Sequence, residues 1–127
     1  MSCFWDTLLS RIKKDDIQTI LSLHNPTPKD FANTLKNKNI PTDNVLWMGE
    51  EIRQQMKEEN MKHINDYNSS TIPNGYLCST CDPFLLLITE LFQLAIIHHY
   101  NKTIINYQHK TNIKYTITIH NNKGHMW

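Results

Sequence analysis

Apolar residues recur at helical spacing over the first part of the chain. At the start they form a single stripe: Phe4, Trp5, Leu8, Leu9 and Ile12. We therefore expect a first helix that packs on the core along this stripe. The same spacing predicts further helical segments over residues 17–23, 27–35, 42–65 and 83–93. Thr27 and Asp82 are the expected caps of two of these helices, because each precedes a proline that suits the first helical position.

Apolar and polar residues alternate in the last part of the chain, which predicts strands. Strands are expected at 95–100 and 104–107, and residues 113–127 predict a closing hairpin. Its turn is expected at 121–124, and its second strand opens on His125. Helices first and strands last indicate an α+β fold, with N-terminal helices packed on a small C-terminal antiparallel sheet.

Length and charge narrow the class of protein. The chain has 127 residues, so we expect one domain over residues 1–127. Its net charge is +1, from 13 basic and 12 acidic residues, and it has no basic run, so we expect no nucleic-acid partner. No apolar run reaches the ~20 residues of a membrane span, and we expect no membrane attachment. The N-terminus lacks a secretory signal, which favours the cytoplasm and three reduced cysteines.

The two ends of the chain supply candidate catalytic residues. Ser2 is the expected cap of the first helix, which puts Cys3 in its first turn. Free backbone N–H groups and the helix dipole favour a thiolate there, so Cys3 is a candidate nucleophile. A nucleophilic cysteine needs a base, and His125 at the far end offers one. Cysteine first and histidine last is the chain order of papain-like proteases.

Three blocks of sequence resemble the ovarian tumour (OTU) family of cysteine proteases. Residues 3–8, Cys-Phe-Trp-Asp-Thr-Leu, resemble its nucleophile motif. Residues 85–97 resemble its helix-to-strand segment, and residues 117–125 resemble its closing strand, turn and histidine. The blocks occur in the family's order over nearly the whole chain, and the compactness is more like that of small viral members than of cellular ones.

The resemblance implies a papain-like OTU fold and a deubiquitinase-like hydrolase. Cys3 would attack an isopeptide or peptide carbonyl after a Gly-Gly terminus, and His125 would accept and return the proton. The implied partner is ubiquitin, a ubiquitin-like modifier or a viral polyprotein, and a viral member would act as a monomer in the host cytoplasm without a cofactor or metal. The alternative is a non-catalytic ubiquitin-binding or host-interaction module on the same fold.

The chain departs from the family's pattern on both sides of the proposed pair. Asp-Gly-x usually precedes the cysteine and helps form the oxyanion hole, whereas Met1 and Ser2 precede Cys3 here. Loss of one such donor costs ~10²–10³ in rate, so we expect slow turnover. The family often has Asp or Asn two residues after the histidine, where this chain has Trp127. Either a Cys/His dyad acts alone, or Asn121, Asn122 or a carboxylate from elsewhere orients the ring.

The position of Trp127 suggests two further expectations. It ends the sequence soon after His125, which suggests excision from a larger polyprotein. Its side chain either lines the cleft near the pair or packs on the protein. His120 lies five residues before His125 across the expected turn and is a candidate cross-strand neighbour.

The remaining cysteines form a C-x-x-C sequence. Cys78 and Cys81, with His98 and His99 downstream, are a weak match to zinc-ligand patterns. A zinc-stabilised binding domain is therefore a third hypothesis. The simpler interpretation is two reduced cysteines that flank the start of a helix.

Overall fold

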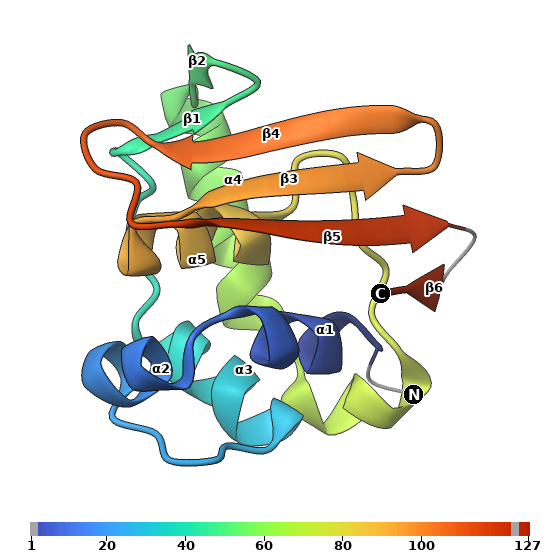
Figure 1. Cartoon of the computed structure of the whole chain (residues 1–127). Helices are drawn as coiled ribbons and strands as arrows, with labels where there is room; N and C mark the ends of the chain where they lie inside the picture. Colours follow the sequence, from blue (N-terminus) through green and yellow to red (C-terminus); the bar gives the residue numbers. More distant parts are fainter. Residues whose placement is uncertain (1–2, 123–124) are drawn as a thin grey trace.

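The computed structural model describes residues 3–122 and 125–127, and it describes Cys3 through its backbone alone. The chain folds into helices and a sheet of the α+β class, as expected (Figure 1). The helices are α1 (Cys3–Arg11), α2 (Lys14–Leu21), α3 (Pro28–Asn37), α4 (Gln54–Asp66) and α5 (Pro83–Phe92), with a 3-10 helix η1 (Ser69–Asn74). The strands are β1 (Val45–Trp47), β2 (Glu50–Glu51), β3 (Ala95–Tyr100), β4 (Thr103–His109), β5 (Thr116–Asn122) and β6 (His125–Met126).

The strands form one six-stranded sheet in the order β2-β1-β4-β3-β5-β6. The sheet is mixed, so the expectation of an antiparallel sheet is wrong at one pair: β3 and β5 run parallel. After the β3–β4 hairpin, the loop over residues 110–115 carries the chain past the end of β3, where the Lys114 N–H donates to the Gln93 carbonyl at 2.8 Å. β5 therefore pairs with the far side of β3 instead of with β4.

The expected long helix over 42–65 is also wrong in its first part. Residues 45–51 form the hairpin β1–β2, and α4 begins only at Gln54. Met48 and Gly49 make the turn with φ values of 52° and 81°, a left-handed conformation that glycine adopts without steric cost. The hairpin extends the sheet because β1 pairs with β4, and a helical apolar spacing did not reveal this tertiary pairing.

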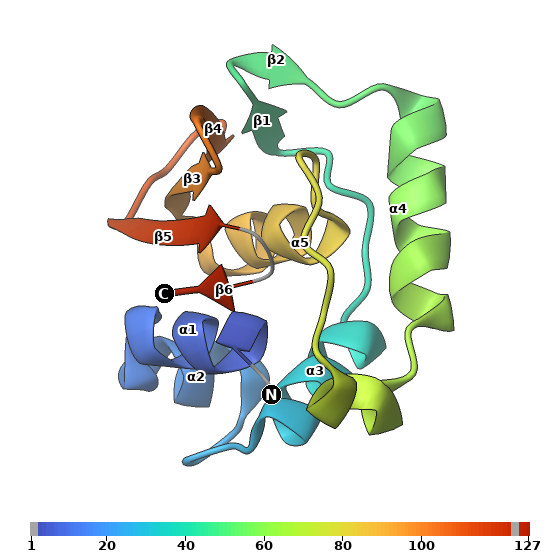
Figure 2. The same ribbon diagram turned by 90° about the vertical axis from the view of Figure 1, so that its right-hand side faces the viewer.

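The helices lie against one face and one edge of the sheet. Figure 2 shows α5 and α4 on one side of the sheet, and α1, α2 and α3 beneath the edge formed by β6. α5 is buried almost throughout, as expected for a central helix. Alternate residues of the strands face it: Ile96, Ile105, Tyr107, Ile117 and Ile119. Within the described residues, no helix is long and apolar enough to cross a bilayer.

Two predicted helix caps are confirmed. The Thr27 hydroxyl accepts from the Asp30 N–H at 3.1 Å, and the Asp30 carboxylate accepts from the Thr27 N–H at 3.4 Å, which completes a capping box. Asp82 accepts from the N–H groups of Phe84 and Leu85 at 2.9 and 3.3 Å. The predicted cap Ser2 lies outside the described residues.

Candidate active site

The fold brings the two ends of the chain together. α1 begins at Cys3, β6 begins at His125, and β6 packs on α1. Both views show β6 beside the N-terminal half of α1 (Figures 1 and 2). The side chain of Cys3 lies outside the described part of the structure, so what the fold brings together is the start of α1 and β6.

α1 is held in place by aromatic side chains of its apolar stripe. Trp5 is fully buried and its indole N–H donates to the Tyr67 hydroxyl at 3.1 Å. The Phe4 ring lies 4.3 Å from the Tyr76 ring, centroid to centroid. Because these rings lie in the first turn of α1, they anchor the helix N-terminus on Tyr67 and Tyr76, which precede and follow η1. The dipole and free amides of such an N-terminus favour a thiolate at the first helical position.

The closing hairpin differs from its predicted form. β5 continues through Asn122, which pairs with His125, and Asn121 pairs with Met126. The expected four-residue turn is wrong because its first two residues belong to the strand; the other two, at 123–124, lie outside the described residues. In this register His120 lies opposite Trp127, with which it exchanges two 2.9 Å backbone hydrogen bonds, and not opposite His125.

The side chains of the last strand alternate between the two faces of the sheet. Met126 is buried in the core, and His125 is exposed. The His125 and Trp127 rings stack with centroids 5.4 Å apart and planes 27° apart. The Asn121 amide donates to the backbone carbonyl of His125 at 3.1 Å. Asn121 thus holds the main chain at His125, which is a different role from the ring hydrogen bond that the sequence left open.

A second cysteine–histidine pair joins a half-buried cysteine to a buried histidine. The Cys78 Sγ is 3.9 Å from the Nε2 of His98, whose side chain is fully buried. The other ring nitrogen of His98, Nδ1, is buried without a hydrogen-bond partner in the described structure. The sequence grouped these residues as weak zinc ligands, and the fold does bring Cys78 and His98 together.

The electrostatics of this inner pair oppose nucleophilic chemistry. Burial, reinforced by the negative charge of Asp82, raises the pKa of the Cys78 thiol far above its ordinary value. Burial lowers the pKa of His98 to about 4. Both groups are therefore neutral near pH 7, whereas a reactive cysteine requires a thiolate.

The cap residue Asp82 organises the loop that carries Cys78. Besides its helix contacts, the fully buried carboxylate accepts from the Tyr76 hydroxyl at 2.9 Å and from the Ser79 N–H at 3.4 Å. The Tyr107 hydroxyl accepts from the Asp82 N–H at 3.2 Å. Burial raises the pKa of Asp82, and these donors act in the opposite direction. The sequence predicts the cap but not this network, since Tyr76 and Tyr107 carry no local signal for it.

The zinc hypothesis receives no support from the described residues. Cys78 and Cys81 are both free thiols, which agrees with the simpler interpretation. Among residues 3–122 and 125–127, no group of three or more His, Cys, Asp or Glu side chains could hold a metal ion. Two ligands are fewer than a structural zinc site uses.

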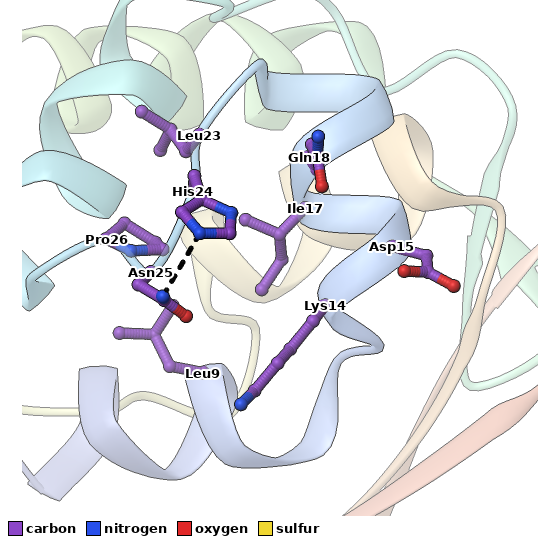
Figure 3. Close-up of a pocket in the computed structure, with 9 residues that line it drawn as sticks. All are labelled: Leu9, Lys14, Asp15, Ile17, Gln18, Leu23, His24, Asn25 and Pro26. Atoms are coloured by element: carbon purple, nitrogen blue, oxygen red, sulfur yellow. Dashed lines mark hydrogen bonds between the residues drawn. The ribbon is translucent and has the colours of Figure 1, made fainter.

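A pocket of about 420 Å³ lies at the other end of α1 (Figure 3). Ile17 and His24 point toward one another across it, and the Asn25 amide hydrogen-bonds to His24 at 3.3 Å. Its remaining lining residues are Leu9, Lys14, Asp15, Gln18, Leu23 and Pro26. The pocket therefore involves the C-terminal end of α1 and is separate from the candidate pair.

Comparison of the chain with protein-family models, curated proteins and solved structures finds no match. The case for a function therefore rests on the residues and on their arrangement. Of the two cysteine–histidine pairs, only the one at the chain ends has an exposed imidazole and a cysteine at a helix N-terminus.

Proposed function

We propose that this chain is a cysteine peptidase of the OTU type, with a compact papain-like fold. Cys3 is its nucleophile and His125 its general base. The observation that carries the proposal is the packing of α1, which begins at Cys3, against β6, which begins at His125. Of the three sequence blocks that resemble the OTU family, residues 3–8 lie in α1 and residues 117–125 end at His125. Residues 85–97 include most of the central helix α5.

The proposed reaction has two halves: acylation of Cys3, and hydrolysis of the resulting thioester. His125 takes the thiol proton, and the thiolate of Cys3 attacks the carbonyl carbon of the scissile bond. Collapse of the tetrahedral intermediate breaks the C–N bond, and the imidazolium returns the proton to the leaving amine. His125 then deprotonates a water molecule, which attacks the thioester and releases the carboxylate product and the thiol.

The proposed substrate is the Gly-Gly terminus of ubiquitin or a ubiquitin-like modifier, or a similar junction in a viral polyprotein. An exposed β6 at the edge of the sheet leaves His125 accessible to an extended chain. Trp127, at 47% exposed, offers an apolar surface beside it that suits a tail without side chains. The free thiols Cys78 and Cys81 are consistent with a reducing compartment, such as the cytoplasm of a host cell.

The test uses a fluorogenic ubiquitin C-terminal amide and a ubiquitin activity probe that traps a reactive cysteine. Wild type should turn over the amide and form the adduct, whereas Cys3→Ala and His125→Ala should do neither. Cys81→Ser is the matched control, because it removes a free thiol that contacts Met56 on α4 and should react as wild type does. Ubiquitin binding without adduct formation would instead support the non-catalytic module.

A further inference from the structure

Four rings form a continuous stack across three strands, which we call the ring stack: His99, His120, Trp127 and His125. His99 and His120 are 4.5 Å apart with planes 13° apart. His120 and Trp127 are 5.2 Å apart with planes 9° apart, and His125 closes the stack on Trp127. All separations lie within the 4.5–7 Å of favourable ring pairs.

The strand register produces this stack. His99 is paired with His120 in the parallel β3–β5 ladder, so their side chains lie on the same face. Trp127 faces His120 through two backbone hydrogen bonds, and His125 lies two residues before Trp127 on the same side. Trp127 is therefore fixed by two backbone hydrogen bonds to His120 and by the stacking of its ring on the His120 ring, independently of its contact with His125.

We propose that Trp127 is the positioning residue for His125 and takes the place of the hydrogen-bonding third residue of a triad. This inference rests on the proposed function of Cys3 and His125. Trp127 occupies the position where the OTU pattern often has Asp or Asn. A carboxylate orients an imidazole by occupying one ring nitrogen, whereas the indole contacts the ring face and leaves both nitrogens at the edge for proton transfer.

The stack also suits the charge that forms during the reaction. When His125 accepts the thiol proton it becomes a cation, and its ring centre lies 5.4 Å from the centre of the Trp127 ring system. A cation within ~6 Å of an indole face is attracted by the ring quadrupole. Trp127 thus both limits rotation of the His125 ring and stabilises its protonated form. Asn121 contributes by holding the His125 carbonyl.

The first arm of the test measures catalysis. Trp127→Ala should lower kcat about 10- to 100-fold, because loss of orientation at the reacting group affects rate more than binding, and KM should change less than twofold. Trp127→Phe keeps a stacking ring and should retain most of kcat. Ile40→Ala is the matched control, because Ile40 is an apolar side chain of similar exposure, 42%, that lies between α3 and β1 and belongs to no strand of the sheet. A Trp127→Ala enzyme with unchanged kcat would overturn the proposal.

The second arm does not depend on any substrate. Iodoacetamide labelling, read by peptide mass spectrometry, gives the alkylation rate of Cys3 in each variant. His125→Ala and Trp127→Ala should both slow it, and Trp127→Phe should restore it. If His125→Ala slows alkylation and Trp127→Ala does not, the positioning role is wrong and the pair stands. If His125→Ala has no effect, the pair itself is wrong, and so is the positioning role.

Discussion

The two candidate cysteine–histidine pairs of this protein lie in different environments. His98 is fully buried, its Nε2 lies 3.9 Å from a thiol, and burial holds both partners neutral. His125 is exposed on an edge strand beside the N-terminus of a helix that begins with Cys3. The buried pair resembles a dyad in distance alone. The comparison teaches that environment, more than proximity, decides which of the two candidate pairs could be reactive.

The surroundings of each pair explain this difference. Asp82, Tyr76 and Tyr107 hold the loop of the buried pair in one arrangement, and a negative charge beside Cys78 disfavours its thiolate. Around His125 the neighbours are an indole face and a backbone hydrogen bond, which restrict the ring without burying it. The contacts around Cys78 and His98 hold that site in one arrangement, whereas the imidazole edge of His125 stays open to solvent.

Replacing each of the two histidines by alanine should give the largest contrast between effects on turnover and effects on stability. His125→Ala should lower the turnover of the ubiquitin amide about 10³-fold, because it removes the general base, and should leave the urea midpoint nearly unchanged. His98→Ala should lower the free energy of unfolding by about 2 kcal/mol through the cavity it leaves. Its turnover per folded molecule should match wild type. A large loss of turnover in folded His98→Ala would contradict the assignment.

Asp82, which holds the loop that carries Cys78, should contribute strongly to the stability of the protein. Asp82→Ala should destabilise the protein by about 3 kcal/mol, because it removes a helix cap and leaves buried donors unpaired. Thr27→Ala is the matched control: it removes an exposed cap and should cost only about 1 kcal/mol. Urea unfolding measures both. Equal losses in the two variants would mean that the Tyr76 and Ser79 contacts add nothing to the Asp82 cap.

Local signals in the sequence were sufficient for the helices but not for the sheet. Asp82-Pro83 and Thr27-Pro28 predicted two helix starts correctly because a cap and a following proline act within one turn. The β1–β2 hairpin was missed because its strands are short and are stabilised by β4, which is distant in sequence. The parallel β3–β5 pair was missed for the same reason, since no local pattern encodes which side of a strand its neighbour takes.

The candidate site shows the same limit. His125 and Cys3 were found because their positions at the chain ends matched a known order of residues. The ring stack was not found, because it depends on the register of β5 with β3 and β6, and the expected pairing of His120 with His125 does not put Trp127 opposite His120. The sequence left the third residue open for this reason.

The reactivity of the two half-buried thiols, Cys78 and Cys81, can be measured directly. Burial raises the pKa of Cys81 to about 11 from an ordinary value of 9.0, so its thiolate fraction at pH 8 should be about 100-fold lower than in the unfolded chain. In a Cys3→Ala background, Cys81 should therefore react with a disulfide reagent about 100-fold more slowly than after denaturation, and Cys78, whose pKa is raised further, should react more slowly still. Similar rates in the folded and unfolded protein would show that Cys78 and Cys81 are accessible and reactive in the folded state.

The pH dependence of stability should report the buried histidine. The pKa of His98 is lowered from 6.5 to about 4, so the unfolded chain binds a proton in this window and the folded protein does not. The free energy of unfolding should accordingly fall as the pH drops from 6.5 to 4, by about 2 kcal/mol at pH 4.5. Asp82, whose pKa is raised, acts in the opposite direction, so the useful quantity is the difference between wild type and His98→Gln. Urea titrations of both proteins across this range should show a steeper loss in wild type, and parallel curves would mean that His98 is protonated in the folded state.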